Sequence, residues 1–497
     1  MWSSAAASRL ISTTLMFVTA IAAAAVTAPA SHSQGDALEA VGNQIGSARI
    51  WVEQAKMAAV DEVPAVAEAL GDCGKLYGEA EWMVEPLLGR GNISYSRDDA
   101  ITWLSAALAN HRSCVDGLGE SGLTINAPDL TPSFAKALAS YANPSAASTP
   151  SKAVSTGDQN SSIIENGGVL LTSWTATTSK ADMVVAKDGS GTHRSIEEAV
   201  AAAAAAARAG RHKHRLVIYV KAGVYEERVE IPRHLRNLMM VGDGIDRTIV
   251  TGSRNVPDGS TTYNSATFGV SGDGFWARDI TFENTAGPQK HQAVAMRANS
   301  DRALFYRCSF KGYQDTLFLH SLRQFYRDCR IYGTIDFIFG DASAVLQNCD
   351  IYIRNPMRHQ ANHVTAQGRE DPNQNTGFSI HGCRVRPAPD LDRAFTGRTY
   401  LGRPWKEYSR TVVWQTDLDG IIHPKGWNEW RGSFALSTLY YAEYRNTGSG
   451  AATQGRVRWP GFHLLTTPQQ VGDFTVSRFI QGDAWIPASG VPFWLDV

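Results

Sequence analysis

Two aspartates, Asp315 and Asp336, lie in similar local sequences, Gly-Tyr-Gln-Asp-Thr and Gly-Thr-Ile-Asp-Phe, 21 residues apart. Carboxylates are side chains that can act as nucleophiles, acids or bases. Two carboxylates held close together are rarely both ionised, so one can attack or accept a proton while its neighbour stays protonated as an acid. The pair therefore predicts covalent or general acid–base catalysis, provided that the fold brings the two side chains together.

Two glutamines and an arginine–tryptophan pair could complete such a site. Gln314 precedes the first aspartate and Gln292 lies upstream; if their amides converge, they could bind the negative oxygen of a tetrahedral intermediate. The alternative is that both bond to local backbone. Arg403 and Trp405 are two residues apart in an extended segment, which puts both side chains on one face. An arginine beside Asp336 would keep that carboxylate ionised, and an indole is a platform for a sugar ring. The alternative is a surface salt bridge beside a core tryptophan.

A repeated strand pattern surrounds these residues and predicts how they are positioned. Segments 305–310, 325–332 and 345–352 alternate apolar and polar residues around a cysteine, and a looser copy spans 378–385. The cysteines of the first three copies are 21 and 20 residues apart. A near-constant period of short strands is typical of a solenoid with stacked coils. A parallel β-solenoid would place the two aspartates on adjacent coils, about 4.8 Å apart.

The cysteines of the repeat favour a structural role. Cys308, Cys329, Cys349 and Cys383 are tens of residues apart, unlike the short paired spacings of zinc ligands. Neighbouring coils would bring Cys329 and Cys349 within bridging range, so we expect a disulfide there. The sequence has no Gly-x-Ser-x-Gly elbow, which argues against a serine hydrolase.

The N-terminal segment and two Asn-x-Ser motifs predict export of the protein. Residues 1–34 resemble a secretory signal, with an arginine, an apolar run over 10–26 and then small residues, and we expect their removal. No later apolar run reaches the roughly 18 residues of a membrane span, so we expect no membrane contact afterwards. Asn92 and Asn160 each begin an Asn-x-Ser glycosylation acceptor.

Residues 36–143 have helical periodicity and predict an antiparallel helical bundle. Cys73 and Cys114 fall in separate helices, and an oxidising compartment favours a disulfide between them. The expected helices span 37–59, 63–88 and 98–118.

A linker, rich in Ser, Thr and Ala, is predicted over 144–180, and a second domain over 181–497. An alanine-rich helix over 196–209 would cap the strand stack. Residues 1–180 carry 10 Lys+Arg and 17 Asp+Glu; subtracting these from totals of 47 and 48 leaves 37 and 31. An acidic front half and a mildly basic back half fit a polyanionic partner for the back half, or docking of the two halves.

Several motifs of the second domain resemble plant pectin methylesterases, and the match extends from about Met183 to the C-terminus. The helical region resembles the pectin methylesterase inhibitor domain that precedes the catalytic domain in many such enzymes. The matching segments are 312–316, 333–340, 367–377, 401–405 and 456–461 in the second domain, and 72–73, 77 and 102–114 in the first.

The resemblance implies an all-β right-handed parallel β-helix, preceded by an all-α antiparallel bundle, that hydrolyses the C6 methyl esters of cell-wall homogalacturonan. It implies no metal and no organic cofactor. It assigns Asp336 as the nucleophile, Asp315 as the proton donor and base, and the family's disulfide to Cys329 and Cys349. It also assigns the oxyanion donors Gln292 and Gln314 and the substrate contacts Thr262, Gln292, Arg403 and Trp405.

The expected partner is methylesterified homogalacturonan in the extracellular cell wall, met by a secreted monomer with no nucleic-acid partner. The inhibitor-like domain could dock intramolecularly. One alternative is cleavage of the pectin chain, but hydrolysis needs carboxylates spaced for water attack and calcium-dependent elimination needs a denser acidic cluster, and neither is evident. A non-enzymatic alternative is that the bundle binds another esterase while the solenoid is only structural.

Overall fold

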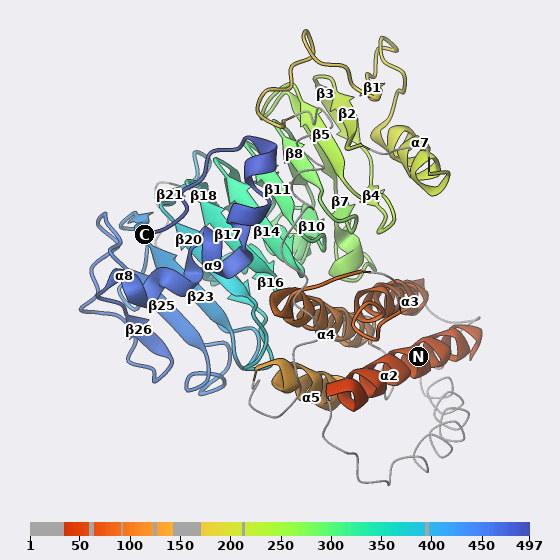
Figure 1. Ribbon diagram of the computed structural model, residues 1–497. Helices are drawn as coiled ribbons and strands as arrows, with labels where there is room; N and C mark the ends of the chain where they lie inside the picture. Colours follow the sequence, from red (N-terminus) through yellow and green to blue (C-terminus); the bar gives the residue numbers. More distant parts are fainter. Residues whose placement is uncertain are drawn as a thin grey trace, which may run out of the picture.

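The computed structural model describes two packed units, a helical bundle and a β-helix (Figure 1). The predicted glycosylation sites Asn92 and Asn160, and the predicted signal segment apart from Gln34, lie outside the described residues. The described residues are 34–58, 64–90, 93–122, 127–142, 170–210, 214–392 and 397–497.

The helical unit forms because apolar residues recur on one side of each helix and share one core. A capping box between Ser96 and Asp99 begins the third of these helices. The predicted disulfide between Cys73 and Cys114 is present and joins the second and third helices. The helices described here are α2 (Gln34–Ala58), α3 (Pro64–Val84), α4 (Arg97–Glu120) and α5 (Thr131–Ala142).

The second unit is a right-handed parallel β-helix made of three parallel sheets, A, B and C, which confirms the predicted fold class. Sheet A contains β1 (Met183–Val185), β2 (Leu216–Val220), β5 (Leu238–Gly242), β8 (Trp276–Arg278), β11 (Ala303–Tyr306), β14 (Arg323–Arg327), β17 (Ser343–Gln347), β20 (Gly377–His381), β23 (Arg410–Trp414), β25 (Tyr440–Tyr444) and β26 (Phe462–Leu464). Sheet B contains β3 (Gly223–Glu226), β6 (Thr248–Gly252), β9 (Thr281–Asn284), β12 (Ser309–Lys311), β15 (Arg330–Gly333), β18 (Asp350–Ile353), β21 (Arg384–Pro387) and β24 (Asp417–Leu418). Sheet C contains β4 (Val229–Ile231), β7 (Phe268–Val270), β10 (Met296–Ala298), β13 (Leu317–Leu319), β16 (Ile338–Gly340), β19 (Asn362–Gln367) and β22 (Thr399–Gly402).

Side chains from successive coils stack inside the β-helix and hold the coils in register. The rings of Phe305 and Tyr326, one coil apart, are stacked with centroids 4.8 Å apart. The helix α7 (Ile196–Arg208) packs at one end of the stack, beside β1, β2 and β4, as the sequence predicted. Short helices α8 (Pro468–Val471) and α9 (Val476–Ile480) cover part of the outer face of sheet A.

The last part of the predicted linker belongs to the β-helix. Leu171 and Trp174 are buried against the outer face of sheet A. The guanidinium of Arg278 donates hydrogen bonds to the backbone carbonyls of Leu171, Thr172 and Trp174. Two large apolar side chains within a polar, aperiodic segment give no repeat from which this packing could be predicted.

The predicted disulfide between Cys329 and Cys349 is wrong for this structure. Both residues are buried free thiols, as are Cys308 and Cys383, in the turns between sheets A and B. Equivalent positions on neighbouring parallel coils are about 4.8 Å apart, whereas the Cβ atoms of a disulfide are typically about 3.8 Å apart. The thiol of Cys329 instead donates to the carbonyl of Phe305 at 3.4 Å.

The helical bundle packs against the outer face of sheet C (Figure 1). Alternation along β13 points Leu317 and Leu319 into the β-helix core and Phe318 outward into the core of the bundle. Phe339 on β16 and Ala366 on β19 join the same cluster. The two units therefore share a continuous apolar contact at this face.

Candidate active site

The two aspartates lie on adjacent coils, as their spacing predicted. Asp315 precedes β13 and Asp336 precedes β16, and these strands pair in parallel with Leu317 beside Ile338. The backbone N–H of Asp315 donates to the carbonyl of Ile335 at 3.1 Å. Both side chains line one cavity of about 260 Å³ between the two units. The two aspartates are therefore neighbours at one cavity.

Both aspartates have a left-handed backbone, with φ of 61° at Asp315 and 51° at Asp336. Non-glycine residues rarely adopt this region, although aspartate tolerates it better than most. The same conformation recurs at coil turns away from the cavity, such as those at Arg307 and Asp328, so it is a feature of the turns of this β-helix. Here the sharp turn before each strand directs a carboxylate into the cavity, where the residues are only 7% and 4% exposed.

Arg403 binds Asp336 through a two-point contact. Its Nε donates to Oδ1 at 2.8 Å and its Nη2 donates to Oδ2 at 2.6 Å. Burial raises the pKa of Asp336, and the hydrogen bonds and charge of Arg403 act in the opposite direction. Fork-shaped pairing of this kind is the strongest form of an arginine–carboxylate contact.

Asp315 has a different electrostatic environment. Burial raises its pKa well above the usual value, and the charges of Asp336 and Glu120 raise it further. The charge of Arg403 acts against this, but its guanidinium bonds are made to Asp336. The pair is therefore unequal, with the proton favoured on Asp315 and the negative charge on Asp336.

The two glutamines also meet at this cavity. Gln292 and Gln314 form a parallel bridge, in which the N–H of Ala293 donates to the carbonyl of Gln314 at 3.3 Å. Both residues line the cavity with the aspartates. The two glutamines therefore lie side by side at the cavity, which is the proximity that the sequence left open.

Aromatic residues form one wall of the cavity, and the sequence analysis missed most of them. Phe318 and Phe339 stack with ring centroids 4.2 Å apart, and Trp405 meets Phe339 edge-on at 6.0 Å. The guanidinium of Arg403 lies 4.3 Å from the ring of Trp430. Phe318 and Phe339 each follow a site aspartate by three residues. This shared position in the repeat is the signal that could have identified them.

Helix α4 of the bundle closes the cavity from the other side. Ser113, Asp116, Gly117 and Glu120 line it together with the β-helix residues. Glu120 accepts hydrogen bonds from Thr262, at 2.7 Å from its backbone N–H and 2.6 Å from its hydroxyl. The one predicted substrate contact on this loop is therefore occupied by a carboxylate of the chain itself.

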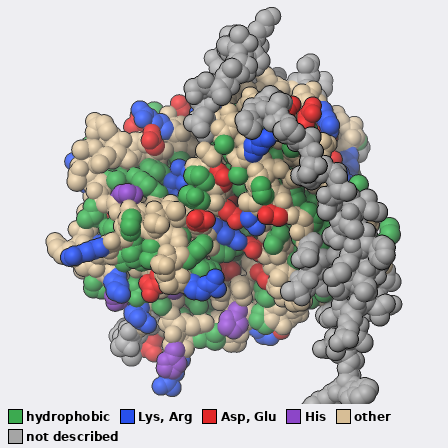
Figure 2. All heavy atoms as spheres, turned by 90° about the horizontal axis from the view of Figure 1, so that it is seen from below, with side chains coloured by type: hydrophobic (Ala, Val, Ile, Leu, Met, Phe, Trp, Pro, Cys, Tyr) green, Lys and Arg blue, Asp and Glu red, His purple; other side chains and the backbone are tan. Residues whose placement is uncertain are grey.

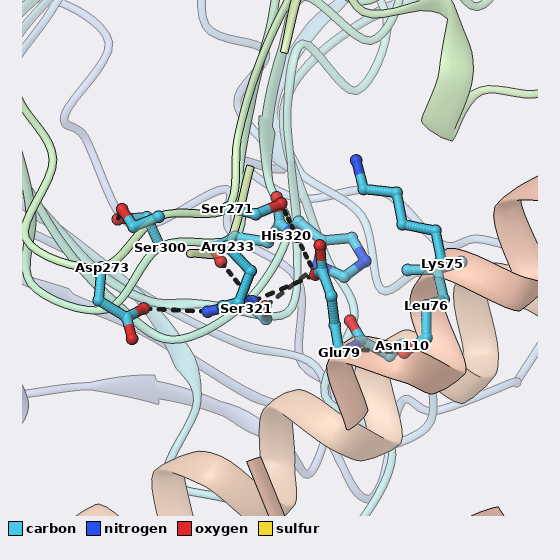
Figure 3. Close-up of polar contacts among 12 residues, drawn as sticks. Lys75, Leu76, Glu79, Asn110, Arg233, Ser271, Asp273, Ser300, His320 and Ser321 are labelled. Atoms are coloured by element: carbon cyan, nitrogen blue, oxygen red, sulfur yellow. Dashed lines mark hydrogen bonds and ion pairs between the residues drawn. The ribbon is translucent and has the colours of Figure 1, made fainter. Parts of the chain in front are cut away.

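Further polar contacts join the bundle to sheet C beside the cavity (Figure 3). Glu79 on α3 accepts hydrogen bonds from Arg233 at 3.1 Å and from Asn299 at 2.6 Å. His320 contacts Ser113 through its Nε2 at 2.9 Å. On the face drawn in Figure 2, acidic and basic side chains intermingle instead of forming separate areas. The contact of Glu79 with Arg233 agrees with docking of the acidic front half on the more basic back half.

The parallel β-helix and the buried aspartate pair in its cavity fit a hydrolase that works with carboxylates. Comparison with known proteins gives the family. Residues 182–483 match the family described as Pectinesterase, and residues 8–153 match the family described as Plant invertase/pectin methylesterase inhibitor. The chain belongs to the pectinesterase family and carries an inhibitor-type domain before its catalytic domain.

Similar proteins support this assignment over most of the chain. It is 53% identical to "Probable pectinesterase/pectinesterase inhibitor 36" of Arabidopsis thaliana, with 97% of each chain covered. It is 51% identical to "Pectinesterase 2" of Citrus sinensis, covering 85% of this chain and 80% of the relative. The solved "Pectin methylesterase from Carrot" is 53% identical with a TM-score of 0.63, covering 65% of this chain and 100% of the carrot chain. Within the described residues, no helix is long and apolar enough to cross a membrane.

Proposed function

We propose that this pectinesterase removes the C6 methyl groups of homogalacturonan with Asp336 as the nucleophile and Asp315 first as the acid and then as the base. The observation that carries the proposal is the unequal environment of the pair. Arg403 bonds to Asp336 at two points, whereas the charges of Asp336 and Glu120 raise the pKa of Asp315. Both pKa values are raised, that of Asp315 further, so the proposal assigns the proton to Asp315 and the negative charge to Asp336.

In the first step, a carboxylate oxygen of Asp336 bonds to the ester carbon. The carbonyl π electrons move to its oxygen, and the amides of Gln292 and Gln314 stabilise that negative charge. A carboxylate leaves more readily than methoxide, so the intermediate reverts unless the departing oxygen is protonated. Asp315 supplies this proton, methanol leaves, and an acyl-enzyme anhydride forms at Asp336.

In the second step, Asp315 accepts a proton from water while the water oxygen attacks the acyl carbon. The bond to Asp336 then breaks with its electrons returning to the aspartate. A free galacturonate carboxylate is released; it loses the remaining proton to solvent, while Asp315 keeps the one that it took from water. Asp315 is then protonated again and Asp336 is ionised again, so Asp315 acts as the acid in the first step and as the base in the second.

The direct test is Asp336→Asn, with Asp350→Asn as the control. Asp350 is an aspartate on β18 of sheet B, away from the cavity. Loss of the nucleophile should lower methanol release by about three or more orders of magnitude, as when other covalent nucleophiles are removed. The same methylated pectin is assayed for reducing ends and unsaturated products, which report hydrolysis and elimination of the chain. Near-normal methanol release from a folded Asp336→Asn protein would remove Asp336 from this role.

A second function is favoured by the position of α4, which closes the cavity with Asp116 and Glu120. We propose that the helical domain inhibits its own catalytic domain by occupying the cleft. An opened chain carrying Glu68→Gln, Asp116→Asn and Glu120→Gln loses three carboxylates that contact the β-helix. Its methanol release should exceed that of the parent chain by about ten-fold or more, because each charge-assisted contact contributes on the order of 1 kcal/mol. Equal activities of the two folded chains would contradict inhibition.

Secretion to the cell wall is proposed from the signal-like segment 1–34 and from the wall polymer that pectinesterases modify. Expression in a secreting plant cell, followed by N-terminal sequencing of the exported protein, tests it. A mature chain that starts close after residue 34 is expected. Retention of the full chain inside the cell would contradict the proposal.

A further inference from the structure

Asp341 is a buried carboxyl group close to the active site that the mechanism does not use. It directly follows β16, five residues after Asp336, and it is only 7% exposed. Burial raises the pKa of Asp341 to about 7, against the lowering effect of hydrogen bonds from Thr376 and Gln374. Burying a carboxyl group costs free energy that its contacts must offset, so these contacts indicate its role.

The carboxylate of Asp341 orients two glutamine side chains. Gln367 donates from its Nε2 to Oδ1 at 3.2 Å, and Gln374 donates from its Nε2 to Oδ2 at 2.6 Å. Because a carboxylate only accepts hydrogen bonds, each amide must point its NH2 group at Asp341 and its oxygen away from it. Both glutamines belong to segment 367–377, a motif that matches the family and to which the mechanism assigns no role.

Each glutamine oxygen accepts hydrogen bonds from two backbone N–H groups. The four donors are Glu370 and Asp371 for Gln374, and Arg369 and Arg410 for Gln367, at 2.6 to 3.0 Å. If either amide turned over, its NH2 group would face two N–H donors and all of them would lose their partners. One carboxylate therefore fixes the path of segment 367–377 and, through Arg410, ties it to the residues that follow β22.

The residues tied down in this way, 403–410, carry two groups of the cavity wall. At the start of this stretch the N–H of Arg403 donates to the carbonyl of Thr365 at 3.0 Å. Near its end the N–H of Tyr408 donates to the carbonyl of Arg369, also at 3.0 Å. The stretch therefore has fixed points on both sides of the residue between them that faces the cavity, Trp405.

The ring of Trp405 lies directly on segment 367–377. A Cβ added at Gly368 would be 2.8 Å from the ring, so no side chain separates the two. Gly368 is itself held by its N–H, which donates to the carbonyl of Gly340 at 2.8 Å, beside Asp341. Any displacement of this backbone moves the surface on which the indole lies.

We propose that Asp341 is a positioning residue for the esterase reaction: through Gln367 and Gln374 it sets the place of Trp405 on the cavity wall. This inference deepens the proposed function, on which it rests, by naming the group that holds the ring against which the substrate lies. Asp341 does not line the cavity of the aspartate pair, so its effect reaches the substrate only through that ring. Its loss therefore acts on KM and leaves kcat almost unchanged.

The test is steady-state methanol release from methylated pectin by the opened chain, with kcat, KM and Tm measured for each variant. Asp341→Asn keeps an oxygen for Gln367 and Thr376 but puts an NH2 group opposite the NH2 group of Gln374. KM should rise about ten-fold, which corresponds to about 1.4 kcal/mol, while kcat stays within about two-fold of the opened chain. Tm should fall as well, because a buried donor has lost its acceptor.

An exchange of donor and acceptor separates positioning from a general loss of stability. In Asp341→Asn combined with Gln374→Glu, the new amide donates to the new carboxylate, whose other oxygen still accepts from the two backbone N–H groups. KM of this double variant should return to within about two-fold of the opened chain. Gln374→Glu alone should be at least as defective as Asp341→Asn, because it puts two carboxylates side by side.

Glu443→Gln is the matched control. Glu443 is also a buried carboxylate, 3% exposed, and it accepts hydrogen bonds from Arg456 and Trp427 on the side of sheet A. Its loss should lower Tm and leave KM within about two-fold. A fall in Tm with Asp341→Asn and no rise in KM would overturn the proposal, as would a double variant that regains Tm but not KM.

If Asp341→Asn does not fold, Gln374→Met removes the same hydrogen bond from the other side, and an unchanged KM in that variant would overturn the proposal equally. The comparison of KM values does not depend on which aspartate attacks the ester. An active Asp336→Asn chain would therefore contradict the proposed mechanism without altering the KM ratio between Asp341→Asn and its parent.

Discussion

Replacement of Arg403 by lysine separates the charge of this residue from its shape. Arg403 makes two hydrogen bonds to Asp336, at 2.8 and 2.6 Å. A lysine keeps the positive charge but is a point donor that cannot reproduce the planar fork. The variant therefore retains attraction to the carboxylate and loses about one of its two charge-assisted hydrogen bonds.

The size of the effect follows from that lost bond. A hydrogen bond to a charged group contributes about 1.5 to 3 kcal/mol. One pKa unit corresponds to about 1.4 kcal/mol, so the pKa of Asp336 should rise by about one to two units. The ionised fraction of the nucleophile then falls about 10- to 100-fold on the acid side of the pH profile. Activity should recover partly as the pH is raised, until Asp315 loses the proton that it must donate.

The assay is kcat/KM for methanol release as a function of pH, in the opened chain with and without Arg403→Lys. The parent should give a bell-shaped profile whose two apparent pKa values belong to the pair. The variant should give a lower and narrower bell-shaped profile, in which activity begins to rise at a higher pH than in the parent. Arg307→Lys is the matched control, because Arg307 binds Asp279 through Nε and Nη2 with the same fork at an exposed turn.

A uniform fall in kcat/KM with an unmoved acid limb would refute this reasoning. It would show that Arg403 acts through another contact, such as the one with Trp430, and does not control the ionisation of Asp336.

Three further outcomes are expected. Asp315→Asn should abolish turnover and raise Tm. The rise in Tm should grow as the pH increases from about 4, because the raised pKa of Asp315 makes the folded parent bind a proton that the unfolded chain releases. A Tm difference that does not depend on pH would contradict this. Gly368→Ala would place a Cβ 2.8 Å from the ring of Trp405, so a folded variant should have a KM for methylated pectin several-fold higher; an unchanged KM would show that this ring does not position substrate. Thiol titration of the denatured, unreduced protein should find four free cysteines, whereas two would indicate one disulfide among Cys308, Cys329, Cys349 and Cys383.

The parts of the site that depend on repeat spacing could be predicted from sequence. In a parallel β-helix, two residues separated by one repeat length lie beside each other on neighbouring coils. The separation of 21 residues therefore predicted that Asp315 lies beside Asp336. The pairing of Arg403 with Asp336 was foreseen as a possibility, because the motif put the side chains of Arg403 and Trp405 on one face of an extended segment. The same repeat spacing led to the wrong prediction of a disulfide between Cys329 and Cys349. Repeat spacing predicts where the backbone lies but not whether two sulfur atoms are close enough to bond.

What the sequence could not give was the occupant of the cleft. Asp116 and Glu120 are four residues apart on α4 and resemble any solvated acidic helix face. Only the packing of the bundle on sheet C shows that these carboxylates meet Lys406 and Thr262. Contacts between domains have no fixed sequence separation, so no periodicity in either half reports them.

The proposed inhibition makes the helical domain and the substrate competitors for one cavity. In that case the substrate and the domain use the same cavity, so a substitution of Thr262, which lines the cavity and bonds to Glu120, affects both. A tethered domain acts at an effective concentration of about a millimolar, which a dilute polymer cannot match when both use the same contacts. Efficient release therefore requires a loss of the covalent connection or of the acids on α3 and α4. Tighter binding of the substrate by the cavity does not achieve it.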